Sequence, residues 1–110
     1  MGRIEGKVCL ITGASSGLGE AAARLLASEG GRLVITDIDQ QKGEALAKEL
    51  TGKGCEVTFL PHNVVSEDDW TRVFHELLAK YERLDVLLNN AGGGTYNDLE
   101  TLSLKEWRDI

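Results

Sequence analysis

The sequence lacks any long hydrophobic run, and the longest one near its start is the four-residue stretch VCLI at 8–11. Such a run is far too short for the core of a signal peptide or for a membrane span. Cysteine is also scarce: Cys9 and Cys55 do not form a C-x-x-C pair, and each lies in a short apolar segment. This pattern favours buried, reduced thiols over a disulfide, so we expect a cytoplasmic protein that does not associate with a membrane.

Positive charge is in short supply, because 12 Lys and Arg residues face 18 Asp and Glu residues. The net charge is −6 and the isoelectric point is about 4.8. An acidic surface repels phosphate backbones, which argues against a nucleic-acid partner and is typical of a solvated exterior. With 110 residues, 42% of them hydrophobic, the chain suits one globular domain. We expect no metal site.

Four short, β-rich apolar segments alternate with helical segments along the chain. Strands are expected at 7–12, 32–37, 56–60 and 85–90, and helices at 19–30, at 40–54 and from Ser66 onward. Strands that alternate with helices predict an α/β fold, with a parallel sheet, right-handed crossovers and helices on both faces. The expected strand order is 3-2-1-4. It places a topological switch point between the first and fourth strands, where such folds bind ligands.

Two of the expected helices carry apolar residues at helical spacing, which indicates the face that each turns to the core. On the second helix these residues are Ala45, Leu46 and Leu50. On the third helix they are Trp70, Val73, Phe74, Leu77, Leu78 and Tyr81. We interpret both stripes as core and not as part of a ligand site.

The segment ITGASSGLGE joins the first expected strand to the first expected helix, and its glycines are Gly13, Gly17 and Gly19. It is not a Walker A loop, because no Gly-Lys-Ser/Thr follows, and its G-x-x-x-G-x-G spacing also differs from G-x-G-x-x-G. Glycines here allow a sharp turn, a close approach of the backbone to a pyrophosphate and tight packing of the helix on the strand. The alternative is a tight connection with no ligand.

Asp37 ends the second expected strand, eighteen residues after Gly19. An acid at about this distance is placed to accept hydrogen bonds from ribose hydroxyls, and it would repel a 2′-phosphate. The neighbouring residues Ser16 and Ile38 are not basic. The pocket is therefore expected to favour NAD over NADP. The alternative role for Asp37 is that of an acid at the start of the next helix, where Asp39 could also serve.

TGASSGLG at 12–19, Asp37 and NNAG at 89–92 together resemble the classical short-chain dehydrogenase/reductase family, and the likeness runs along the whole chain. The resemblance implies a Rossmann-type nucleotide-binding fold and an NAD-dependent oxidoreductase. Such an enzyme moves hydride between the nicotinamide and a secondary alcohol or ketone, such as a hydroxysteroid or a 3-oxoacyl compound. It also implies a homodimer or homotetramer.

The resemblance further implies which residues bind the cofactor. In the family Asp-Val usually lies against the adenine, and Asn63 departs from this pattern, although its amide can still bond an adenine edge. Asn89 is expected to tie the central strand to its neighbour. The implied cofactor-binding residues are Thr12, Gly13, Ser15, Ser16, Gly17, Leu18, Gly19, Asp37, Asn63, Val64, Asn90, Ala91 and Gly92.

The Tyr-x-x-x-Lys pair on which catalysis in the family rests is missing. Tyr81 is followed by ERLD and Tyr96 by NDLE, and we expect His62 and His75 to be solvated or packed and not to replace the pair. The segment TLSLKEWRDI begins a helix with a capping box formed by Ser103 and Glu106. We therefore expect 1–110 to be an NAD-binding domain that stops before the catalytic segment of a longer enzyme. The alternatives are a stand-alone, non-catalytic dinucleotide-binding module and a structural remnant that binds nothing.

Overall fold

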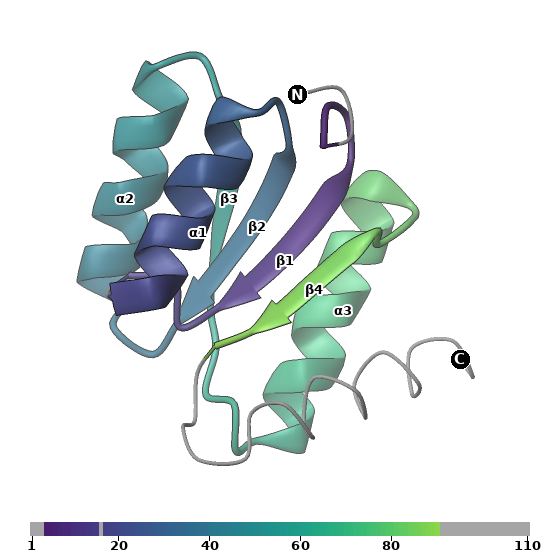
Figure 1. Cartoon of the computed structure of the whole chain (residues 1–110). Coiled ribbons are helices and arrows are strands. Elements are labelled where there is room, and N and C mark those ends of the chain that lie inside the picture. Colours follow the sequence, from purple (N-terminus) through teal and green to yellow (C-terminus); the bar gives the residue numbers. More distant parts are fainter. Residues whose placement is uncertain (1–3, 16, 91–110) are drawn as a thin grey trace.

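The computed structural model of the chain describes residues 4–15 and 17–90. Within these residues four strands and three helices alternate along the chain (Figure 1). The strands are β1 (Val8–Thr12), β2 (Arg32–Asp37), β3 (Glu56–Pro61) and β4 (Val86–Asn89), and the helices are α1 (Gly17–Ser28), α2 (Gln40–Gly52) and α3 (Glu67–Tyr81). The helix predicted from Ser103 lies outside the described residues.

The strands form one parallel sheet in the order β3-β2-β1-β4, which confirms the predicted topology. The central strand β1 pairs with β2 and β4, so that Leu10 lies opposite Val34 on one side and Leu87 on the other. All five residues of β1 are buried. A continuous buried run of this kind is expected when helices cover both faces of a parallel sheet.

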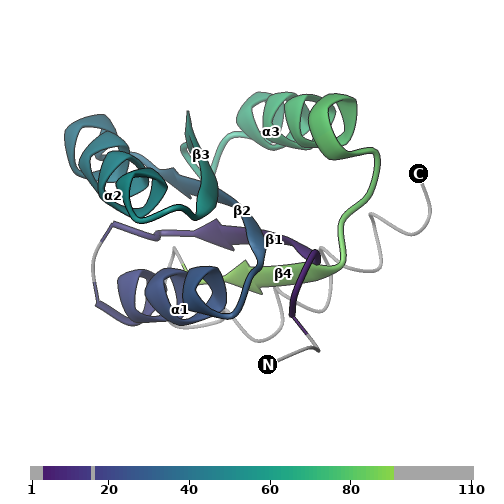
Figure 2. The same ribbon diagram turned by 90° about the horizontal axis from the view of Figure 1, so that it is seen from above.

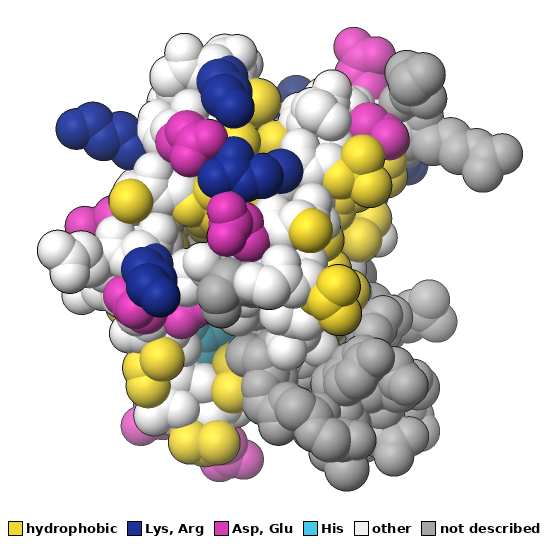
Figure 3. All heavy atoms as spheres, turned by 60° about the vertical axis from the view of Figure 1, so that its left-hand side comes forward, with side chains coloured by type: hydrophobic (Ala, Val, Ile, Leu, Met, Phe, Trp, Pro, Cys, Tyr) yellow, Lys and Arg dark blue, Asp and Glu magenta, His cyan; other side chains and the backbone are white. Residues whose placement is uncertain are grey.

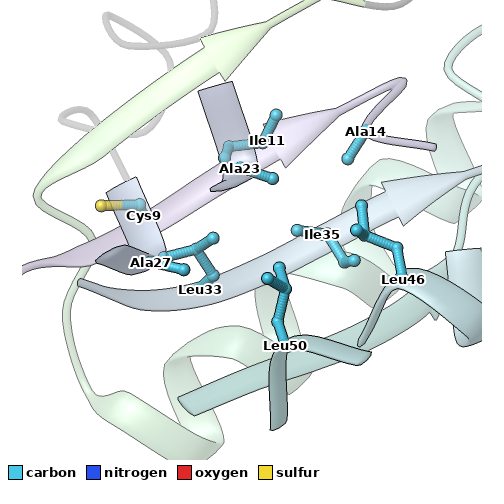
Figure 4. Close-up of a cluster of buried hydrophobic side chains, with 9 residues drawn as sticks. All are labelled: Cys9, Ile11, Ala14, Ala23, Ala27, Leu33, Ile35, Leu46 and Leu50. Atoms are coloured by element: carbon cyan, nitrogen blue, oxygen red, sulfur yellow. The ribbon is translucent and has the colours of Figure 1, made fainter. Parts of the chain in front are cut away.

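Alternate residues of β1 enter two separate cores, because successive side chains of a strand point to opposite faces. Figure 2 shows α1 and α3 on opposite sides of β1 and β4. The core between the sheet and α1 and α2 contains Cys9, Ile11, Ala14, Ala23, Ala27, Leu33, Ile35, Leu46 and Leu50 (Figure 4). The core between the sheet and α3 contains Val8, Leu10, Val34, Val73, Leu77, Leu84 and Leu87, with Trp70, Phe74, Leu78 and Tyr81 packed against it.

The stripe predicted on α3 is confirmed as core, whereas the prediction for α2 is wrong in one residue. Ala45 is exposed, and Gly43 is buried beside Leu46 and Leu50. The physical reason is the close contact of α2 with β3: a Cβ added at Gly43 would lie 2.0 Å from Cε1 of Phe59. The helix therefore turns its residue without a side chain to the sheet, and Ala45 points away.

The helix ends follow local rules of capping. Asp39 caps α2 by accepting a hydrogen bond from the Lys42 N–H, and Ser66 caps α3 by accepting one from the Asp69 N–H. The cap at Ser66 confirms the predicted start of α3. Helix α1 begins at Gly17, two residues before the predicted start.

The outer surface of α1 and α2 is charged, and acidic and basic side chains lie against one another there (Figure 3). Arg24 on α1 pairs with Glu20 on its own helix and with Glu49 on α2, at 2.9 and 2.6 Å. Cys9 and Cys55 are both free, and the predicted burial is found for Cys9, whereas Cys55 is half-buried. No helix in the described part of the chain is long and apolar enough to cross a membrane.

Candidate functional site

The residues predicted to form a site gather at one edge of the sheet. Because all strands of the sheet are parallel, their carboxyl ends lie side by side, and the arrowheads in Figure 1 point towards the first turn of α1. The segments that follow β1, β2 and β3 therefore meet here, and Asn90, which follows β4, joins them. The switch point of the strand order lies between β1 and β4.

The glycine-rich loop after β1 has two of the features predicted for its glycines, a sharp turn and close packing of the helix. Gly13 and Gly17 have φ angles of +63° and +59°, a left-handed backbone that residues with a Cβ adopt at a cost. A Cβ added at Gly19 would lie 2.2 Å from the carbonyl oxygen of Gly13 and 2.7 Å from Nδ2 of Asn90. The first turn of α1 is thus packed so closely on the loop that only glycine fits at residue 19.

The amide end of α1 gives this loop its electrostatic character. The first N–H groups of a helix have no partner within the helix, and the helix dipole adds positive potential at this end. Leu18 lies in the first turn and is 76% exposed. Such an end is suited to an anion such as a pyrophosphate.

Hydrogen bonds among Thr12 and two asparagines join the ends of β1 and β4 at the switch point. The Thr12 hydroxyl donates to Oδ1 of Asn89 at 2.8 Å and accepts from the Asn90 N–H at 3.0 Å. Nδ2 of Asn90 donates to the Gly13 carbonyl at 3.2 Å. These bonds join the ends of β1 and β4, and the one from Thr12 to Asn89 confirms the tie predicted for Asn89.

Asp37 faces the glycine-rich loop from the end of β2. Its Oδ2 accepts from the hydroxyl of Ser15 at 2.7 Å and from the Ser15 N–H at 3.1 Å, and its Oδ1 accepts from the Asp39 N–H at 2.8 Å. Partial burial alone would raise the pKa of Asp37, but the hydrogen bonds from Asp39 and Ser15 bring it below the ordinary value. Asp37 is therefore a fixed carboxylate, and the role of helix cap belongs to Asp39.

The segment after β3 is held by side chains of α3. Oδ2 of Asp69 accepts from the Asn63 N–H at 2.7 Å, and Nε1 of Trp70 donates to the Val64 carbonyl at 2.7 Å. Arg72 donates to the carbonyl of Pro61. Sequence reasoning did not assign these three residues to the site. The available signal was the Ser66 cap, because it starts α3 so that its first turns lie beside the segment.

His62 lies behind this segment and is 2% exposed. Its Nδ1 is 2.9 Å from the Thr36 hydroxyl, and its ring meets that of Trp70 edge-on, with centroids 4.3 Å apart. Within the described residues, Nε2 of His62 has no hydrogen-bond partner. Burial lowers the pKa of His62 to about 4, so the imidazole is neutral at pH 7. Of the two expected states of His62, solvated or packed, the structure shows the packed one.

Three of the predicted site residues, Ser16, Ala91 and Gly92, lie outside the described residues. The structure brings the others together along the carboxyl edge, from Thr12 at the switch point to Asn63 and Val64 at the far end. Tyr81 lies at the end of α3 in the second core, away from this edge. Among residues 4–15 and 17–90 no cluster of His, Cys, Asp or Glu is suited to hold a metal ion.

Comparison with known proteins gives a family match. The model of the short chain dehydrogenase family matches residues 7–110. Tropinone reductase-like 1 from Erythroxylum coca is 44% identical over 90 residues, which are 82% of this chain and 32% of that protein. Cyclopentanol dehydrogenase from Comamonas testosteroni is 36% identical over 110 residues, which are 100% of this chain and 44% of that protein. The chain thus spans less than half the length of these relatives.

Solved structures share the fold. A short chain dehydrogenase from Mycobacterium smegmatis has a TM-score of 0.79 and 33% identity, over 86% of this chain and 40% of that one. A short chain dehydrogenase/reductase from Burkholderia phymatum in complex with NAD has a TM-score of 0.76 and 31% identity, over 79% of this chain and 31% of that one. A metagenomic short-chain oxidoreductase in complex with NADP has a TM-score of 0.78 and 38% identity, over 83% of this chain and 41% of that one. Similar folds in this family therefore hold either dinucleotide.

Proposed function

The chain belongs to the short chain dehydrogenase family, and from this premise we propose that it is the cofactor-binding part of an NAD(H)-dependent oxidoreductase. The observation that carries the proposal is the close packing at Gly19, where an added Cβ would collide with Gly13 and Asn90. A backbone kept free of side chains beside the amide end of a helix fits a bound pyrophosphate. The bound cofactor would supply or accept the hydride.

The proposed binding mode follows the strand order. The pyrophosphate lies at the loop 13–19, and the adenosine ribose lies at Asp37 on the neighbouring strand. The base reaches the segment after β3, at Asn63 and Val64. Asn90, Ala91 and Gly92 line the cofactor on the β4 side of the switch point, and Thr12 contributes by holding the loop in shape.

The preference for NAD rests on the charge of Asp37. Its carboxylate is ionised at pH 7, and it is held in place by Ser15 and Asp39. A 2′-phosphate on the ribose would meet this charge without a basic partner, because Ile38 is not basic and the hydrogen bonds of Ser15 already go to Asp37. The ribose hydroxyls of NAD instead donate to the carboxylate.

Substrate chemistry needs residues beyond those found in 1–110. We propose that the natural protein oxidises secondary alcohols or reduces ketones, in the cytoplasm and as a homodimer or homotetramer. The 110-residue chain by itself is expected to bind the dinucleotide without transferring hydride, because it has no Tyr-x-x-x-Lys pair. A stand-alone dinucleotide-binding module is the second candidate function.

Calorimetric titration of the natural protein with NAD⁺, NADH and NADP⁺ tests the cofactor assignment. We expect NAD(H) to bind more tightly by about tenfold or more, the factor that roughly 1.4 kcal/mol of charge repulsion provides. An absorbance assay for NADH with a panel of secondary alcohols and ketones then separates the two functions. Equal or tighter binding of NADP⁺ contradicts the NAD preference, and binding without turnover in the natural protein favours the module.

A further inference from the structure

Two consecutive residues of the glycine-rich loop form hydrogen bonds with the end of β2. The Ala14 N–H donates to the Thr36 carbonyl at 3.1 Å. Ser15 makes two further bonds, because its N–H and its hydroxyl both donate to Oδ2 of Asp37, at 3.1 and 2.7 Å. The loop therefore holds one oxygen of the Asp37 carboxylate, and the side chain of Ser15 makes the shorter of the two bonds to it.

The other oxygen of Asp37 is held separately, by the residue before α2. Oδ1 accepts from the Asp39 N–H at 2.8 Å. Ser15 and Asp37 are both half-buried, so neither group is surrounded by water on all sides. Because the two oxygens are bonded to different segments, a change at the Ser15 hydroxyl alters the surroundings of Oδ2 and leaves the bond at Oδ1 in place.

The bond to Oδ2 determines what the Ser15 hydroxyl offers to a ligand. A serine hydroxyl has one proton to donate and two lone pairs that accept, whereas a carboxylate only accepts. Partial burial opposes the ionisation of Asp37, but the hydrogen bonds from Asp39 and Ser15 keep its pKa below the ordinary value. The proton between Ser15 and Asp37 therefore comes from the serine. With this proton directed to Asp37, Oγ of Ser15 presents only lone pairs.

A pair of acceptors matches ribose hydroxyls and not a phosphate. A ribose hydroxyl at the Asp37 carboxylate is also within reach of Oγ of Ser15, which lies 2.7 Å from Oδ2, and it can donate to either atom. A 2′-phosphate is mostly a dianion at pH 7, and its oxygens accept hydrogen bonds. It finds no proton at Ser15 while Asp37 is present. In an Asp37→Ala variant the Ser15 proton is free, and the same hydroxyl can donate to a phosphate.

We propose that Ser15 helps to select the dinucleotide and that Asp37 sets the direction of its effect. Beside the Asp37 carboxylate, the Ser15 hydroxyl accepts from the ribose and favours NAD. Without the carboxylate, it donates to the 2′-phosphate and favours NADP. The inference rests on the proposed dinucleotide function and deepens it, because it assigns the selectivity to a hydrogen-bonded pair and not to the charge of Asp37 alone.

The test uses the natural full-length protein and its Ser15→Ala, Asp37→Ala and doubly substituted variants. The measured quantity is the dissociation constant for NADP⁺ divided by that for NAD⁺, obtained by calorimetry. We expect Ser15→Ala to lower this ratio about three- to tenfold in the wild-type background, the factor that one hydrogen bond provides. In the Asp37→Ala background we expect it to raise the ratio by a similar factor. A general loss of loop structure weakens both cofactors alike and cancels in the ratio.

Two further variants separate the hydroxyl of Ser15 from other effects of substitution. Ser15→Thr keeps a hydroxyl and should restore the wild-type ratio. Ser28→Ala is the matched control, because it removes a hydroxyl from an exposed residue at the end of α1, where the hydroxyl donates to the Leu25 carbonyl at 2.7 Å. It should leave the ratio unchanged.

The outcomes distinguish the inference from the proposed function. If Ser15→Ala leaves the ratio unchanged, or shifts it in the same direction in both backgrounds, the inference is overturned and the proposed function stands. If Asp37→Ala does not fold, the ratios of Ser15→Ala and Ser15→Thr in the wild-type background decide, and equal ratios overturn the inference. Failure of the natural protein to bind either dinucleotide overturns the proposed function and the inference with it.

Discussion

The hydroxyl of Thr12 donates a 2.8 Å hydrogen bond to Oδ1 of Asn89, although the two residues are 77 positions apart in the chain. Both side chains are almost fully buried, with exposed fractions of 0% and 2%. The same hydroxyl accepts from the Asn90 N–H at 3.0 Å. One oxygen therefore joins the ends of β1 and β4 at the point where the proposed cofactor site opens.

Thr12→Val should destabilise the protein by about 1–3 kcal/mol, because it leaves buried polar groups of Asn89 and Asn90 without their partner. The measurement is the free energy of unfolding in urea. Thr12→Ser keeps the hydroxyl and is expected to lose less than about 1 kcal/mol. Equal stability of the two variants would show that the hydroxyl is not what holds the strands together.

Asp37→Ala should narrow the preference for NAD over NADP, because it removes the fixed carboxylate beside the ribose. We expect the ratio of the two dissociation constants to fall about tenfold, equivalent to roughly 1.4 kcal/mol. Asp39→Asn is the control, since asparagine also caps helices well and residue 39 contacts Asp37 only through its N–H. If the ratio of the dissociation constants changes equally in both variants, the carboxylate of Asp37 is not what sets the preference for NAD.

Much of the fold follows from the sequence because each signal is local and strong. Apolar runs such as RLVITD, separated by helical segments, define the parallel sheet, and Asp37 and the glycine loop then meet because parallel strands end at one edge. The prediction that Ala45 faces the core is wrong because the face that α2 turns to the sheet depends on its contact with Phe59 of β3.

The contacts by which α3 holds the segment after β3 could not be predicted from the sequence, for a related reason. Asp69 and Trp70 act on backbone groups of Asn63 and Val64, and any residue supplies such groups. The Ser66 cap indicates that the start of α3 lies beside this segment, but spacing and residue type do not show which side chains of α3 make these contacts. The orientation of the Asn63 amide likewise depends on the position of the Val65 N–H.

Gly43→Ala should destabilise the protein by about 1–3 kcal/mol, because the new methyl group overpacks the contact between α2 and the ring of Phe59. Gly52→Ala is the matched control in the same helix, where an added Cβ meets nothing within 4 Å. It should be neutral or stabilise by up to about 1 kcal/mol. Chemical denaturation of both variants tests this, and Gly43→Ala combined with Phe59→Leu should recover part of the loss.

Stability should fall as the pH is lowered from about 6.5 towards 4, because His62 is buried in its neutral form. Burial is the main cause of its low pKa of about 4; the nearby Asp69 opposes the shift and Arg72 adds to it. In the unfolded chain the histidine takes up a proton near its ordinary pKa of about 6.5, and the folded state resists it. Folding therefore loses at most about 3 kcal/mol across this window, while above pH 6.5 the full stability is present.

Urea unfolding at pH 7, 6 and 5 separates His62 from the other titrating groups. The pKa values of Asp37, Asp69 and Asp85 are all lowered, so their contribution to stability is lost only below the range tested. His62→Gln should flatten the dependence between pH 7 and 5. His75→Gln, at an exposed residue of α3, should keep it. A His62→Gln variant with the wild-type slope would contradict burial of a neutral imidazole as the cause.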